Sequence, residues 1–201
     1  MSRTESSKSP IREGMNVPNR LTLLRMLLIP VIVILILLEK YPPAAILFAV
    51  ASATDFLDGY LARKNNIVTT FGKFLDPVAD KLLVLSSMIM LSAARVCACE
   101  GECVCGGLPV TIPAWLVCAV AARDLLIDGL RMISASGGTV IAAGPFGKIK
   151  TVLQLLTVIS LLLRLPAVLS VILMVLMGIM TLISGADYLI KGKKVFTDSK
   201  E

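Results

Sequence analysis

The sequence predicts an all-α integral membrane protein with six transmembrane helices. Hydrophobic residues make up 56% of its 201 positions, and the mean hydropathy is +0.85. Soluble domains are closer to about 45–50% apolar. Six separate apolar stretches are each long enough to cross about 30 Å of hydrocarbon. Aromatic residues are only 5% of the chain, which suits closely packed membrane helices.

The six predicted spans follow one another with short connections. We expect them near residues 22–38, 43–63, 77–95, 112–133, 148–165 and 167–190. The segments YPPA and RLPA mark two tight turns, and the second predicts that the last two helices form an antiparallel hairpin. Residues 1–20 then form a polar lead-in, 21–190 the membrane domain and 191–201 a basic tail.

The distribution of basic residues predicts the orientation. Of the 20 lysines and arginines, all but Lys40, Arg95 and Arg164 fall towards one side of the predicted helices. The positive-inside rule therefore places both termini in the cytoplasm of a multi-pass protein of the cell membrane. The net charge of +6 carries no stripe of basic and aromatic residues, so nucleic acid is not an expected partner.

Four aspartates interrupt this apolar pattern. Asp55 and Asp58 lie three residues apart in the second span, about 18 Å from its outer end at 1.5 Å per residue. Gly59 and Arg63 continue the same helical face. Asp76 and Asp80 are expected at the start of the third span, with Pro77 in its first turn. Carboxylates at this depth cost several kcal/mol unless they are paired, hydrated or bound to a cation.

A two-metal site explains these carboxylates. Two divalent cations with oxygen ligands would relieve the repulsion among them, and a diphosphate would bridge the metals. Arg63 would add positive charge beside the diphosphate, and Gly59 would allow it to approach the backbone. The structural alternative is that the aspartates form ion pairs with Arg63, Lys73 and Lys81.

The spacing of these residues resembles the defining motif of the CDP-alcohol phosphotransferase family. The matching pattern is Asp55-x2-Asp58-Gly59-x2-Ala62-Arg63-x8-Gly72-x3-Asp76-x3-Asp80. The resemblance implies transfer of a substituted phosphate from a CDP-linked donor to an alcohol, with release of CMP. It also implies that Asp55, Asp58 and Asp76 hold two Mg²⁺ or Mn²⁺ ions, and that Asp80 lies beside the second ion as general base. Family members often form homodimers.

Flanking segments indicate the substrates. NVPNRLTLLR resembles the opening of the first helix in phosphatidylglycerophosphate synthases, a group within this family, and implies that Asn19 and Thr22 lie near the cytidine diphosphate of CDP-diacylglycerol. Helix capping explains Asn19 equally well. Thr69, in the turn between the two halves of the motif, is a weaker candidate for donor binding and has the alternative role of a turn hydroxyl.

A basic cluster is expected to bind the phosphate of the acceptor. Arg123 and Arg131 share one face of the fourth span, and Lys148 and Lys150 open the fifth. GKIKT followed by Gln154 resembles the synthases that use sn-glycerol 3-phosphate. Alternatively, Arg123 pairs with Asp124 or Asp128 and the lysines are interfacial anchors.

The sequence also allows a different acceptor or a different class of protein. An inositol phosphate would suit a similar basic pocket, and a cation transporter would use the aspartates as an ion path.

The loop CACEGECVCGG carries Cys97, Cys99, Cys103 and Cys105 on the side opposite the basic residues. Two short disulfides are an expectation there, with a metal site as the lesser alternative. Cys118 is expected to be a buried apolar residue.

Overall fold

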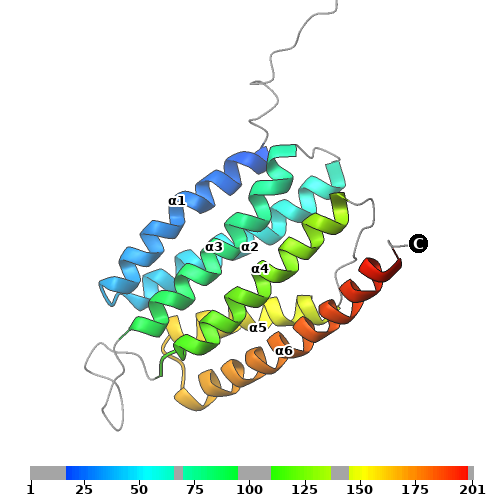
Figure 1. Cartoon of the computed structure of the whole chain (residues 1–201). Coiled ribbons are helices and arrows are strands. Elements are labelled where there is room, and N and C mark those ends of the chain that lie inside the picture. Colours follow the sequence, from blue (N-terminus) through cyan, green and yellow to red (C-terminus); the bar gives the residue numbers. More distant parts are fainter. Residues whose placement is uncertain (1–16, 66–69, 95–109, 137–144, 199–201) are drawn as a thin grey trace, which may run out of the picture.

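The protein is described by a computed structural model for residues 17–65, 70–94, 110–136 and 145–198. These residues form six helices and no strand (Figure 1). The helices are α1 (Val17–Leu37), α2 (Tyr41–Asn65), α3 (Thr70–Ala93), α4 (Ala114–Ser136), α5 (Pro145–Leu162) and α6 (Ala167–Asp198). Each predicted span corresponds to one helix, so the number and order of the helices are confirmed.

The start of α3 differs from the prediction. The helix begins at Thr70, so Pro77 lies seven residues further on and is not in the first turn. A proline at an interior position removes one backbone hydrogen bond and favours a bend. The helix continues through it, which puts Asp76 and Asp80 one to three turns into α3 rather than at its end.

Two short turns set the antiparallel packing of neighbouring helices. After α1, Lys40 N–H donates to Leu35 C=O at 2.9 Å and Glu39 N–H donates to Ile36 C=O at 3.0 Å. Glu39 has a φ of 57°. These are the two bonds and the left-handed residue of a Schellman motif.

The turn after α5 repeats the same geometry. Leu165 N–H donates to Ser160 C=O at 2.9 Å, and Arg164, with a φ of 53°, donates to Leu161 C=O at 3.0 Å. Pro166 follows directly and cannot continue the helix. The α5–α6 hairpin predicted from RLPA is therefore confirmed (Figure 1).

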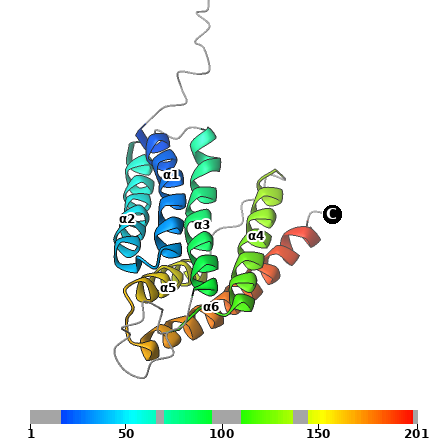
Figure 2. The ribbon, with the colours of Figure 1, turned by 90° about the vertical axis from the view of Figure 1, so that its left-hand side faces the viewer.

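The helices pack in two groups around one core. In Figure 2, α1, α2 and α3 stand side by side, and α5 and α6 cross below them. Helix α5 contacts α2, α3 and α6, while α4 contacts α3 and α6. All six helices contribute fully buried side chains to the core, which include Ile32, Phe48, Met88, Val120, Leu161 and Met177. Helices from both halves of the chain thus meet around a common centre.

Many large apolar side chains point outward from the helices. Leu27, Leu37, Trp115, Val168 and Leu182 are each at least 62% exposed. In the part of the chain that is described, one helical segment, Ala167–Tyr188, has the length and composition to cross a membrane, with a mean hydropathy of 2.6. Leu23–Leu37 and Tyr41–Thr54 are shorter apolar segments. Six spans therefore remain a prediction.

The expectation for Cys118 was wrong. Its side chain is exposed on the surface of α4. Leu116, Val117 and Val120 are the buried residues of this part of the helix. Because they face the core, residue 118 lies on the opposite side. The four cysteines between 97 and 105 lie outside the described residues.

Candidate active site

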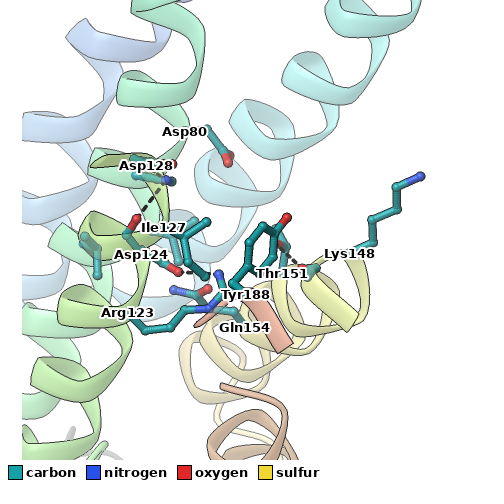
Figure 3. A pocket seen from close by; sticks show the side chains of 13 residues that line it. Asp80, Arg123, Asp124, Ile127, Asp128, Lys148, Thr151, Gln154 and Tyr188 are labelled. Atoms are coloured by element: carbon teal, nitrogen blue, oxygen red, sulfur yellow. Dashed lines mark hydrogen bonds and ion pairs between the residues drawn. The ribbon is translucent and has the colours of Figure 1, made fainter. Parts of the chain in front are cut away.

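A polar pocket opens where four helices meet. It has a volume of about 220 Å³ and is lined by residues of α3, α4, α5 and α6 (Figure 3). Its charged lining residues are Asp80, Lys81, Arg123, Asp124, Asp128 and Lys148. These groups come from α3, α4 and α5, and α6 adds Tyr188, so the pocket exists only when the four helices pack together.

The Asp124 carboxylate is the centre of a buried ion cluster. Lys150 Nζ donates to both of its oxygens, at 2.8 and 2.7 Å, and Arg123 Nη1 donates to Oδ1 at 2.9 Å. Lys150 is only 1% exposed. Two cations against one carboxylate leave a net positive charge at this end of the pocket, which favours an anionic ligand.

The Arg123 guanidinium is only partly satisfied. Its Nη1 is bound to Asp124, but Nε and Nη2 are buried and have no hydrogen-bond partner among the residues that the structure describes. These two N–H groups point along the same edge of the guanidinium, the edge that matches two oxygens of a phosphate. Because an unpaired buried donor costs about 1–3 kcal/mol, this edge is suited to an anion.

A second ion pair links α3 to α4. Lys81 Nζ binds the Asp128 carboxylate and also donates to the backbone carbonyl of Asp124 at 3.5 Å. The sequence also allowed Lys81 to pair with the motif aspartates; in the structure it binds Asp128. Asp80 precedes it in α3 and lines the pocket, half-buried. The Lys81 contacts therefore fix the turn of α3 that carries Asp80.

The four predicted acceptor-binding residues are placed differently. Arg123 lines the pocket, and Lys150 lies behind it, held by Asp124. Lys148 is exposed, and its ammonium group points away from Arg123 and Asp124 (Figure 3). Arg131 belongs to α4, but its side chain is outside the described part. The pairing of Arg123 with Asp124, considered from the sequence as an alternative, is observed.

Most of the motif is described only by its backbone. Asp55, Asp58, Gly59 and Arg63 belong to α2, Asp76 belongs to α3, and Asn19 and Thr22 belong to the first turns of α1. Thr69 lies outside the described residues. Among the side chains that are described, no group of three or more acidic, histidine or cysteine residues could hold a metal. Asp80 is the one predicted ligand in that set, so the metal site stays a prediction.

Sequence reasoning missed Tyr188 as a site residue. It is 4% exposed, comes from α6 and lies with its ring centroid 5.7 Å from the Arg123 guanidinium carbon. A single tyrosine in an apolar helix carries no signal of this contact. The i, i+4 spacing of Asp124 and Asp128 was visible, but not which cation each one binds.

Comparison with known proteins supports an enzyme site. A family described as CDP-alcohol phosphatidyltransferase matches residues 15–183. The chain is 42% identical to the CDP-diacylglycerol–glycerol-3-phosphate 3-phosphatidyltransferase of Bacillus subtilis, over 74% of this chain and 77% of that protein. It is 34% identical to the protein of the same name from Rickettsia felis, over 92% and 100%. For Escherichia coli K12 the identity is 38%, over 74% and 78%.

Proposed function

Because the chain belongs to the CDP-alcohol phosphatidyltransferase family, we propose that it moves the phosphatidyl group of CDP-diacylglycerol to sn-glycerol 3-phosphate. The products are phosphatidylglycerophosphate and CMP. The family is one of transferases, and relatives over most of the chain carry the name of this reaction. Family membership also speaks against the cation transporter considered from the sequence.

The unpaired edge of Arg123 is the observation that favours an acceptor with a phosphate group, and the names of the relatives favour glycerol 3-phosphate over inositol phosphate. Glycerol 3-phosphate differs from a plain alcohol in bearing a phosphate, which needs a positively charged partner. Arg123 lines the pocket, its buried Nε and Nη2 are two parallel donors without a partner among the described residues, and Lys150 shares the Asp124 carboxylate with it. Charge-assisted hydrogen bonds of this kind are worth about 1.5–3 kcal/mol each. The start of α5 adds a helix N-terminus on the same side, since Gly147 and Lys148 line the pocket.

Asp80 is proposed as the general base. The alcohol of the acceptor is a poor nucleophile, so a carboxylate must take its proton as the oxygen attacks phosphorus. Asp80 and Arg123 line the same pocket, so an acceptor held by its phosphate at Arg123 would present its hydroxyl to a cavity that contains a carboxylate. Arg123 would then orient the acceptor, and Asp80 would accept its proton.

Divalent metal is proposed for the donor side. Asp55, Asp58, Asp76 and Asp80 offer only oxygen donors, the ligand type that Mg²⁺ and Mn²⁺ prefer, and α2 packs against α3. When bound, the two ions would stabilise negative charge on the diphosphate and on departing CMP. Asn19, Thr22, Gly59, Arg63 and Thr69 are proposed to contact the donor nucleotide and its diphosphate.

The proposed setting is the cell membrane, crossed six times, with both termini and the site on the cytoplasmic side. The outward-facing apolar side chains would contact lipid there. The donor would reach the site from the bilayer, and the soluble acceptor from the cytoplasm. A homodimer is part of the same proposal.

The test is a comparison of acceptors. Purified protein in lipid nanodiscs would be given CDP-diacylglycerol, Mg²⁺ and either radiolabelled glycerol 3-phosphate or radiolabelled inositol phosphate. We expect CMP release and a labelled lipid only with glycerol 3-phosphate. Equal or greater turnover with inositol phosphate would assign the other acceptor, and CMP release without any labelled lipid would refute the transfer. Asp80→Asn serves as the inactive control.

A further inference from the structure

We propose that Tyr188 is a positioning residue of the acceptor site. Its ring holds the Arg123 guanidinium in the orientation that turns Nε and Nη2 towards the bound phosphate. The inference rests on the proposed function and adds a residue of α6 to a site otherwise made by α3, α4 and α5.

The contact between the two residues bridges distant parts of the chain. The Arg123 guanidinium carbon lies 5.7 Å from the centroid of the Tyr188 ring, within the range of a cation–π interaction. Tyr188 is 4% exposed and packs with Ile127 of α4. In Figure 3 the ring lies beside Arg123, and its hydroxyl end points away from the guanidinium. The ring, and not the hydroxyl, therefore makes the contact.

Two glycines limit the remaining space around Arg123. A Cβ on Gly147 would lie 3.8 Å from Arg123 Nη2 and 3.9 Å from Tyr188 Cε2. A Cβ on Gly185 would lie 3.5 Å from Arg123 Cγ. Gly185 and Tyr188 are three residues apart and share one face of α6. Arg123 therefore crosses from α4 to a surface formed by the ring and by two positions without side chains.

These contacts define the orientation of the guanidinium. Asp124 binds Nη1 on one edge, the Tyr188 ring borders the group, and only the Nε–Nη2 edge has no partner among the described residues. A guanidinium fixed before binding loses less rotational freedom when it takes up two phosphate oxygens. Removal of the ring should therefore weaken binding of the phosphate-bearing acceptor, while the nucleotide-bearing donor is unaffected.

The experiment separates the ring from the hydroxyl. In nanodiscs, the KM for glycerol 3-phosphate and the KM for CDP-diacylglycerol would be measured for Tyr188→Phe and Tyr188→Leu. We expect Tyr188→Leu to raise the acceptor KM about 3- to 30-fold, the range of a desolvated cation–π contact, with the donor KM unchanged. Tyr188→Phe keeps the ring and should stay within about 2-fold of wild type. Tyr41→Leu, a buried ring in the separate main core, controls for lost packing.

A double-mutant cycle tests whether Tyr188 acts through Arg123. In an Arg123→Ala background, Tyr188→Leu should cause no further rise in the acceptor KM. The same rise in both backgrounds would overturn the inference, as would equal rises in both KM values or a Tyr188→Phe effect as large as that of Tyr188→Leu.

Misfolding of a Tyr188 variant and inactivity of the wild type each have a defined consequence. Should Tyr188→Leu fail to fold, Tyr188→Met would replace it, and unfolding of both would make Tyr188 a purely structural residue and overturn the inference. Wild-type protein that forms no lipid product from glycerol 3-phosphate would instead remove the proposed function, and this inference with it. A wild type that turns over normally while Tyr188→Leu keeps its acceptor KM would overturn only the inference.

Discussion

Replacing the Asp124 carboxylate with an amide should strongly destabilise the protein. Asp124→Asn keeps the shape of the side chain but removes the charge that Lys150 binds at 2.7 and 2.8 Å. Lys150 is 1% exposed, so its ammonium group cannot turn to water. Loss of one member of a buried ion pair costs about 3–5 kcal/mol, because the other charge stays buried without compensation.

That free energy converts into a measurable shift in melting temperature. For a chain of this size, 1 kcal/mol corresponds to roughly 2–4 °C, so Asp124→Asn should melt about 6–20 °C below wild type. The protein has a single tryptophan, Trp115, which lies in α4 with Asp124. Its fluorescence during heating of the protein in nanodiscs is therefore a direct assay of this helix.

The matched control is the same substitution one helical turn further along. Asp128 also binds a lysine, but its side chain is 36% exposed and that of Lys81 is 28% exposed. Water screens such a pair, so Asp128→Asn should cost no more than about 1 kcal/mol. Equal melting shifts for Asp124→Asn and Asp128→Asn would refute the argument from burial.

A paired replacement tests the cause more directly. Asp124→Leu combined with Lys150→Met removes the buried Asp124–Lys150 pair and keeps apolar volume, a replacement that is often neutral. Arg123 loses the Asp124 charge in this variant and in Asp124→Asn alike, so the comparison isolates the charge of Lys150. The double variant should melt well above Asp124→Asn. If it melts at the same temperature or lower, the buried charge of Lys150 is not the source of the instability.

The remaining predictions concern catalysis. Asp80→Asn should abolish CMP release but leave binding of CDP-diacylglycerol measurable, because the base is lost and the donor contacts remain; equal loss of both would argue against a base role. Arg123→Lys should raise the acceptor KM by about tenfold or more, since an ammonium group keeps the charge but not the two parallel donors; an unchanged acceptor KM would return Arg123 to a structural role. Exhaustive chelation should stop turnover, and added Mg²⁺ or Mn²⁺ should restore it; activity in metal-free protein would contradict the two-ion proposal. Gly185→Ala should be tolerated, since its Cβ would make an ordinary contact at 3.5 Å, whereas Gly185→Leu should displace Arg123 and raise the acceptor KM.

The sequence predicted the helices well because their signals are local. A span of apolar residues ended by a turn signal defines a helix within its own few residues, and this was enough for the number of helices and for the hairpin at RLPA. It failed at the start of α3, where the sequence predicts Pro77 in the first turn but helical backbone extends back to Thr70. Proline prefers the first turn of a helix, but this local preference did not decide where α3 begins, since the residues before Pro77 are also helical.

Residue type and spacing predicted which residues belong to the candidate site, but not which of them form ion pairs with one another. The motif and the basic cluster identified Asp80, Arg123 and Lys150 as functional candidates from their positions alone. Spacing along one helix could not tell whether Arg123 would bind Asp124, Asp128 or a ligand. In the structure Asp124 forms ion pairs with both Arg123 and Lys150, and Asp128 forms one with Lys81.

By itself, then, the sequence determined an apolar, six-helix chain with a family motif, because hydrophobicity and fixed spacing are properties of neighbouring residues. Only the tertiary structure decided which edge of Arg123 lacks a partner among the described residues, that Lys148 points away from Arg123, that Cys118 is exposed and that Tyr188 lines the pocket. Those outcomes depend on the rotation and depth at which α3, α4, α5 and α6 pack. Each helix carries several possible faces, and contacts between helices that are far apart in the chain select one of them.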